Sequence, residues 1–302
     1  MSAAMQDRAK WTQQRERGSV CAIRVVVWLA LHLGRSVMRV LLYPTCVYFM
    51  LVSSHWQRAS RDYLPRALGR SARFADGWRH CHCFAQCLLD RIYLLNGQQA
   101  RFDVRLLGAP LIDRLRGKGL PLKGLPGRGQ GLLLFGAHLG SFEVTRAVGH
   151  ATACAPISLV MYEDNAKKTS SVLGAINPAL TLEIISLGRP QAMLAVRDRL
   201  ADGHLVGVLP DRSISDERRV QIDFLGAPAW FPEGPFRMAA LLGYPVVFML
   251  GLYRGGRRYD VVFEDLGDPS DVAATMRRYV ALLERHCREA PYNWFNFYDF
   301  WA

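Results

Sequence analysis

A histidine and a glutamate stand five residues apart directly after a short apolar run, in the segment GLLLFGAHLGSFE. The run is long enough for a buried strand that ends just before His138, and a helix starting at Gly140 or Ser141 would carry Glu143 in its first turn. A carboxylate bonded to one imidazole nitrogen fixes the tautomer and leaves the other nitrogen free to accept a proton. The spacing therefore predicts His138 as a general base oriented by Glu143, although such a pair also occurs as a structural cap.

The elements around this pair alternate between apolar runs and helical stretches. The segments GLLLFGA, ISLVMY, LTLEIISL and LVGVLP have the pattern of buried strands, and helical patterns separate them. This alternation is typical of βαβ units around a mostly parallel sheet. The segment PVVFMLGLYRGGRRYDVVFEDL predicts an antiparallel hairpin, and DVAATMRRYVALLERHCREA predicts a closing helix. We therefore expect an α/β fold with a central sheet flanked by helices, and we expect His138 at the carboxyl edge of that sheet, where ligands bind.

The first 56 residues predict a membrane-associated segment. Residues 20–52 are apolar except for a few positions that include Arg24, Arg35 and Arg39, which fall within about 60° on a helix. A spanning helix would hold Arg35 and Arg39 near mid-bilayer at about 2.5–3.5 kcal/mol each, whereas a helix in the interface keeps them among the headgroups. We therefore expect an amphipathic helix lying on the membrane in residues 1–56 and the catalytic domain in 57–302. A helix packed on the protein's own core is the alternative.

Charge and cysteine content narrow the partners and the compartment. The 38 Lys and Arg exceed the 26 Asp and Glu, and the net charge of +12 favours an anionic membrane surface or an acidic carrier protein. The basic residues match no nucleic-acid module, so nucleic acid is not an expected partner. The seven irregularly spaced cysteines favour a reduced cytosolic compartment. His80, Cys83 and Cys87 share a helix face, but the first and last lie about 10 Å apart along the helix, so we expect no metal.

Several motifs in order resemble the late acyltransferases of bacterial lipid A biosynthesis, which carry the H-x4-D/E motif of glycerolipid acyltransferases. The resemblance covers most of the chain and rests on WTQQRERGS, the helix that follows it, HLGSFE, LADGHLVGVLPDRS and FLGAPAWFPEGPFRMAALLGYPVV. It implies that His138 deprotonates a hydroxyl or amine of a lipid acceptor, which then attacks an acyl thioester. The resemblance implies no covalent acyl-enzyme and no cofactor beyond the thioester co-substrate.

The same resemblance suggests residues that bind substrate. Arg212 would stabilise the oxyanion or bind a phosphate, with Asp211 holding it, and a helix starting at Gly234 would offer N–H groups to an anion. A surface salt bridge for Arg212 and a simple turn at Gly234 are the alternatives. Glycines beside His138 would leave room for the substrate. The expected substrate-binding residues are Gly140, Ser141, Asp211, Arg212, Phe231 and Gly234.

Two departures from the lipid A enzymes leave the acceptor open. Glu163 follows Tyr162 where those enzymes carry arginine after tyrosine, and the tail APYNWFNFYDFW is densely aromatic. Such a tail resembles a branch linked to aryl-polyene and related pigment lipids. Packing of the tail against its own sheet is the alternative.

The expected donor is acyl carrier protein, because it is acidic and this chain is basic. The expected docking residues are Arg114, Arg116, Lys118, Lys123 and Arg128. We expect the protein at the cytoplasmic face of the inner membrane. A catalytically silent membrane-bound binding protein would need neither His138 nor Glu143. A lipid esterase is disfavoured, since the sequence has no Gly-x-Ser-x-Gly.

Overall fold

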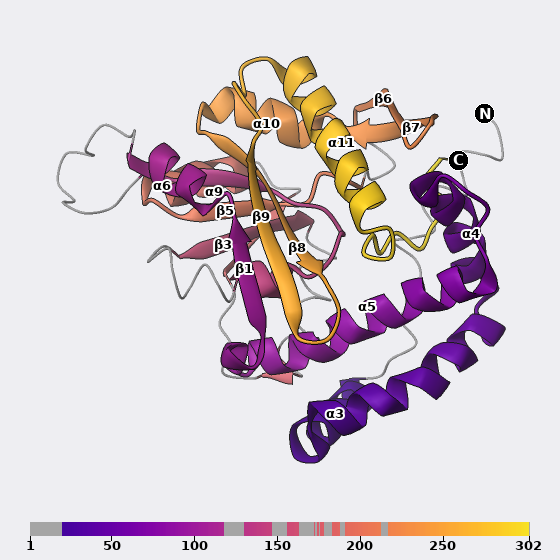
Figure 1. The fold of residues 1–302 in the computed structure, drawn as a ribbon. Helices are drawn as coiled ribbons and strands as arrows, with labels where there is room; N and C mark the ends of the chain where they lie inside the picture. The colour runs from indigo at the N-terminus through magenta and orange to yellow at the C-terminus, as the bar shows by residue number, and fades with distance from the viewer. Residues whose placement is uncertain are drawn as a thin grey trace.

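The computed structural model describes most of the chain (Figure 1). The described ranges are 20–117, 130–146, 156–162, 183–187, 191–212 and 217–301, together with positions 172, 174, 176 and 177. Some residues singled out in the sequence lie outside the described ranges. These are the segment WTQQRERGS, Lys118, Lys123, Arg128 and Glu163.

A seven-stranded sheet in the order β1-β9-β8-β2-β5-β3-β4 forms the centre of the fold. Its strands are β1 (Asp103–Leu107), β2 (Leu132–Phe135), β3 (Ile157–Tyr162), β4 (Glu183–Leu187), β5 (Leu205–Val208), β8 (Val246–Tyr253) and β9 (Arg258–Asp265). β8 and β9 pair antiparallel, and every other neighbouring pair is parallel. The expected α/β fold with a mostly parallel sheet is therefore confirmed, as is the β8–β9 hairpin. β2 and β5 are buried along their whole length, which is why they appear in the sequence as continuous apolar runs.

A second, two-stranded sheet consists of β6 (Arg219–Phe224) and β7 (Ala227–Pro232). Its turn is made by Leu225 and Gly226, which have φ angles of 53° and 80°. Two consecutive positive φ angles define the type I′ turn, whose twist matches that of the flanking strands. Gly226 is the residue type that this turn favours.

Helices cover the sheet on both sides (Figure 1). The described helices after residue 52 are α4 (Ser54–Leu68), α5 (Phe74–Leu95), the 3-10 turn η1 (Gln99–Arg101), α6 (Ala109–Gly117), α9 (Gln191–Ala201), α10 (Gly234–Leu242) and α11 (Val272–Glu289). Of these, α4 packs on α5 and α11. α11 is the closing helix expected from the sequence, and the side chain of Asp271 caps it by accepting a hydrogen bond from Ala274 N. Arg114 and Arg116 lie within α6 rather than in a loop. The expected boundary between residues 1–56 and 57–302 falls inside α4.

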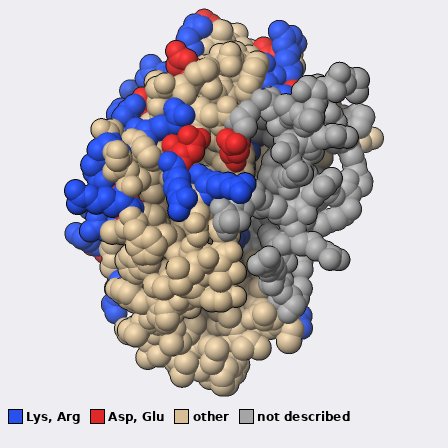
Figure 2. Space-filling model, turned by 90° about the vertical axis from the view of Figure 1, so that its right-hand side faces the viewer, with Lys and Arg blue, Asp and Glu red and all other residues tan. Residues whose placement is uncertain are grey.

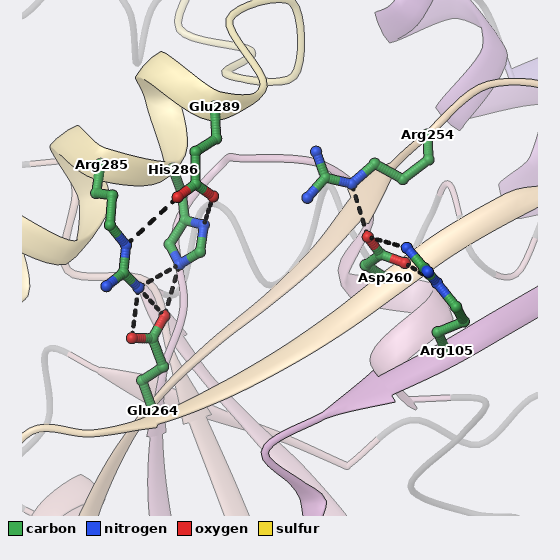
Figure 3. Close-up of polar contacts among 7 residues, drawn as sticks. All are labelled: Arg105, Arg254, Asp260, Glu264, Arg285, His286 and Glu289. Carbon is green, nitrogen blue, oxygen red and sulfur yellow. Dashed lines mark hydrogen bonds and ion pairs between the residues drawn. The ribbon is translucent and has the colours of Figure 1, made fainter.

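Aromatic packing and an ion network fasten α11 to the sheet. The Tyr279 ring of α11 makes an edge contact with Phe248 of β8 at 5.5 Å between ring centroids. His286 Nε2 lies 2.6 Å from Glu264 Oε1 of β9, and Nδ1 lies 3.1 Å from Glu289 (Figure 3). Arg285 also pairs with Glu264. α11 is thus held at the sheet by both apolar and charged contacts.

The N-terminal helix α3 (Val20–Val52) packs along α5. Its regular geometry breaks at Gly34, where φ is 80° and ψ is 163°, and it contains Pro44. Among the described helices it is the one long and apolar enough to cross a membrane. Its outward face is mostly apolar, although Arg24 is also exposed. The exposed large apolar residues are Val25, Val26, Trp28, Leu31, Leu33, Val37, Val40, Leu41, Tyr43, Val47, Tyr48, Phe49, Leu51 and Val52.

The orientation of α3 corrects one expectation from the sequence. Arg35 does not face the headgroups: its side chain is only 6% exposed and pairs with Asp90 of α5 through two hydrogen bonds of 2.7 and 2.8 Å. Helical periodicity predicted the arginine stripe but not which side of the helix meets the protein. The exposed side is mostly apolar, with Arg24 also exposed. Figure 2 shows a broad surface without charged residues across the lower front of the molecule, with Lys and Arg at its edges.

Candidate active site

His138 lies just beyond the carboxyl end of β2, between the ends of β5 and β8. Gly136 N donates to Val208 O at 2.9 Å, so the chain stays beside β5 after β2 itself ends. The His138 side chain is 31% exposed. This is the position at which open α/β sheets bind ligands, as expected from the sequence.

Asp211 is the carboxylate that contacts the imidazole. It follows β5, the parallel neighbour of β2, and is fully buried. Its Oδ2 accepts a hydrogen bond from His138 N and its Oδ1 accepts one from His138 Nδ1, each at 2.8 Å. Because a carboxylate can only accept, Nδ1 carries the proton and Nε2 has a free lone pair. Within the described part of the chain Nε2 has no hydrogen-bond partner.

The electrostatics keep the imidazole neutral and the carboxylate charged. Desolvation lowers the pKa of His138, the positive charge of Arg212 lowers it further, and the contact with Asp211 opposes both effects. Burial alone would raise the pKa of Asp211, but the contact with His138 and the charge of Arg212 outweigh it and leave that pKa below its usual value. At neutral pH the pair is therefore a neutral base beside an anion.

Glu143 does not take the orienting role that its spacing predicted. Its Oε1 forms an ion pair with Arg91 of α5 at 2.6 Å, and its Oε2 accepts from Ser141 Oγ at 3.4 Å. The carboxylate bonded to His138 Nδ1 is Asp211 instead, because the neighbouring strand ends beside β2. Glu143 thus connects the helical turn after His138 to α5.

Gly140 and Ser141 are packed against the backbone of β8. Gly140 has a φ of 81°, and a Cβ added there would lie 2.1 Å from Gly251 O. Ser141 N donates to that same oxygen at 2.7 Å, and its side chain is buried. The expected room for substrate beside Gly140 is therefore filled by protein. The glycine is required because two backbones meet here.

Arg212 and the C-terminal tail complete the surroundings of His138. Arg212 Nη2 donates to Phe295 O at 2.9 Å, and Phe295 N donates to His138 O at 2.8 Å. The guanidinium lies 5.5 Å from the ring centre of Tyr298, and its Nε has no hydrogen-bond partner among the described residues. One residue of the tail thus holds both His138 and Arg212. The aromatic density of the tail was its sequence signal, but the contact itself uses the backbone.

The aromatic side chains of the tail pack into the protein, as the alternative for this segment expected. Trp294 is fully buried, with its ring 4.9 Å from that of Phe300. Phe231 is fully buried in the same cluster, against Phe224 and Phe300. Phe231 therefore belongs to the core, and its expected contact with substrate is not supported by its position.

Gly234 opens α10, as expected, and both carboxylates and arginines lie around it. Glu233 directly precedes it and lies 2.7 Å from Arg218 and 3.7 Å from Arg237. A Cβ on Gly234 would meet Glu217 Oε2 at 3.7 Å. Two carboxylates thus flank the start of α10, and two arginines compensate Glu233, so the expected contact of Gly234 with an anion stays a prediction.

His80 is a structural residue. Its Nε2 lies 2.8 Å from Trp294 O and its Nδ1 lies 3.1 Å from Ser60 Oγ, so both ring nitrogens have partners. Burial lowers its pKa to about 4. Among the described residues, no three His, Cys, Asp or Glu side chains gather in a way that would hold a metal ion.

Two comparisons with known proteins address the family of this chain. A comparison with curated proteins gives no match. Residues 126–302 match the family model described as bacterial lipid A biosynthesis acyltransferase, and this region includes His138, Asp211, Arg212 and the aromatic tail. More than half of the chain lies within the match. The chain therefore belongs to the family of bacterial lipid A biosynthesis acyltransferases.

Proposed function

We propose that this protein is a membrane-associated acyltransferase that moves a fatty or polyene acyl chain from acyl carrier protein to a hydroxyl or amine of a lipid acceptor. The observation that carries the proposal is the pairing of His138 Nδ1 with the buried carboxylate of Asp211 at 2.8 Å. This pairing leaves Nε2 as the proton acceptor on a partly exposed ring. Family membership supports the acyl-transfer chemistry.

The reaction is a single displacement. His138 Nε2 removes the proton of the acceptor hydroxyl or amine as its oxygen or nitrogen attacks the thioester carbonyl. The tetrahedral intermediate collapses, the carbon–sulfur bond breaks, and the thiolate takes the proton from the imidazolium. Asp211 stabilises the transient positive charge on the ring and keeps the ring oriented. His138 ends in its starting state, and no covalent acyl-enzyme forms.

Arg212 is the candidate for stabilising the negative charge that develops on the carbonyl oxygen. Its positive charge acts on His138, and Phe295 O holds one of its nitrogens at 2.9 Å. Its Nε is buried and has no hydrogen-bond partner among the described residues, so a small movement of the side chain would free a donor for an oxyanion or a phosphate. This role is separate from that of Asp211, which bonds His138.

The exposed apolar face of α3 supports a position on the membrane. A contiguous apolar surface of this size on a helix is typical of a lipid or protein contact. Because Arg35 faces the protein, this face meets the acyl region without burying that charge in lipid. We propose that α3 lies in the interface of the inner membrane on its cytoplasmic side, where acyl thioesters are available.

The test uses the full chain in detergent with matched acyl chains on acyl carrier protein and on coenzyme A, and with a bacterial lipid extract as acceptor. Mass spectrometry identifies the acylated product. We expect transfer from the carrier protein at the higher kcat/KM, and we expect His138→Ala to reduce it by about 10²–10⁴-fold. Comparable kcat/KM for both donors would refute the carrier-protein preference. Binding of the acyl donor without any product, or a folded His138→Ala variant that loses less than tenfold, would refute the catalytic assignment.

A further inference from the structure

A cavity opens where the geometry of α3 breaks. Its volume is about 180 Å³, and it lies where α3, η1 and the turn between β8 and β9 come together. Its lining consists of Leu33, Gly34, Arg35, Ser36, Arg101 and Arg257. Half of these residues are arginines, which makes the cavity a candidate site for an anion.

Hydrogen bonds fix the three elements around the cavity. Arg35 of α3 donates to Gly256 O in the β8–β9 turn at 2.5 Å and also pairs with Asp90 of α5. Asp103 N, two residues after Arg101, donates to Arg257 O at 3.0 Å. Figure 1 shows this turn at the end of the sheet next to α5 and α3. The backbones that carry Arg101 and Arg257 are therefore held side by side.

Some arginines at this end of the sheet have a carboxylate partner and others do not. Arg35 is matched by Asp90, and Asp260 accepts from both Arg105 at 2.9 Å and Arg254 at 2.8 Å (Figure 3). Arg101 and Arg257, by contrast, form no ion pair with any residue that the structure describes. The Arg101 guanidinium lies 5.8 Å from the ring centre of Tyr93. The cavity thus has two exposed cations without a carboxylate partner.

The backbone of α3 adds to this preference. Gly34 leaves helical geometry, so the helix starts again after it, and Arg35 and Ser36 at this second start line the cavity. The start of a helix favours negative charge. On the outer side, Leu33 belongs both to the cavity and to the exposed apolar face, and Leu31 and Val37 are exposed beside it. The cavity therefore lies at the border between an apolar and a basic surface.

We propose that this cavity binds the phosphate of an anionic phospholipid headgroup while the apolar face of α3 lies in the acyl region below it. The proposal rests on the membrane association proposed above. An interfacial helix sits at the boundary of headgroups and acyl chains, which puts a cavity at its border at headgroup depth. Arg101 and Arg257, rather than Arg35, whose charge is matched by Asp90, then give the cavity its preference for anionic lipid.

The experiment is vesicle flotation of the full chain with phosphatidylcholine alone or mixed with phosphatidylglycerol. The double variant Arg101→Gln, Arg257→Gln is compared with Arg277→Gln, Arg278→Gln, which removes the same charge from exposed positions on α11, on the other side of the molecule from α3 in Figure 1. We expect the first variant to bind the mixed vesicles about 30-fold more weakly, from the usual contribution of two basic residues at an anionic surface. We expect unchanged binding to pure phosphatidylcholine and a smaller effect of the control.

Equal binding of wild type and the Arg101, Arg257 variant to mixed vesicles would overturn the proposal. If the variant then also loses binding of soluble glycerol phosphate in detergent, the cavity is a site for a soluble phosphate. If the variant instead has a raised KM for acyl carrier protein, the surface is a site for the carrier. Activity in detergent reports separately on His138, and failure of the wild type to bind either vesicle would refute the membrane association itself.

Discussion

Replacing Asp211 by asparagine isolates the contribution of the carboxylate to the base. The amide has nearly the same shape but offers one oxygen and one NH2 group where the carboxylate offers two oxygens. If the oxygen keeps the bond from His138 N, the NH2 group faces Nδ1, which must then accept and sends its proton to Nε2. If the amide is turned over, two N–H donors face each other. In the first case His138 Nε2 loses its free lone pair, and in the second case the imidazole loses its fixed orientation.

The expected loss follows from the value of general-base assistance. That assistance is about 10²–10⁴ in rate, or about 3–5 kcal/mol in the activation barrier. Asp211→Asn is therefore expected to lower kcat by at least 10²-fold with little change in KM. In the double variant with His138→Ala the loss should not exceed that of His138→Ala alone, because the two residues act as a unit.

The pH profile distinguishes an electrostatic role from a structural one. The acid limb of kcat/KM reports the pKa of His138, which lies below its usual value, and activity falls as the pH drops through it. Asp211 raises that pKa, so its removal should move the acid limb to lower pH. A change in packing alone would not move the limb in this direction.

The matched control is Glu143→Gln. Glu143 pairs with Arg91 rather than with His138, so this variant is expected to lose less than tenfold. The assay is steady-state acyl transfer in detergent, with folding checked by circular dichroism. The reasoning is wrong if folded Asp211→Asn stays within tenfold of wild type, or if Glu143→Gln is the more damaging change.

Three further predictions concern stability. Gly140→Ala is expected to destabilise by about 3 kcal/mol or more in urea unfolding, because its Cβ would overlap Gly251 O; unchanged stability would contradict the close packing. Arg35→Met leaves Asp90 buried without its cation and should cost about 3–5 kcal/mol in thermal unfolding, whereas adding Asp90→Leu should restore much of it. His80 has a pKa of about 4 when folded and an ordinary value of 6.5, so the unfolded chain binds the proton first, and stability should fall by about 3 kcal/mol between pH 6.5 and 4. His80→Gln should remove that part of the pH dependence in denaturant titrations.

Local patterns predicted most elements of the fold, but not β1 or the two-stranded sheet of β6 and β7. The alternation of apolar runs and helices indicated the parallel sheet, and the apolar run before His138 placed this residue at the carboxyl edge. These predictions succeeded because burial on both faces of a strand gives a continuous apolar run.

The contacts between residues on different strands could not be predicted from local sequence patterns. The partner of His138 depends on which strands are neighbours, and the placing of β5 beside β2 is set by packing of the whole domain. A sequence spacing of five residues made Glu143 the nearer candidate, although Asp211 is closer in space. Phe295 acts through its backbone, which carries no signal in the residue type. The side of α3 that faces the protein likewise depends on α5.

The position of Phe295 in the chain has a consequence for biosynthesis. α3 precedes every strand of the seven-stranded sheet in the chain, so it is translated before the sheet can form. His138 follows, but the residue whose backbone holds both His138 and Arg212 is made more than half a chain length later. A nascent chain that has not reached Phe295 therefore lacks the backbone contacts that hold His138 and Arg212 in place. A chain truncated before Phe295 is therefore expected to lack the arrangement of His138 and Arg212, even though it retains α3 and Asp211.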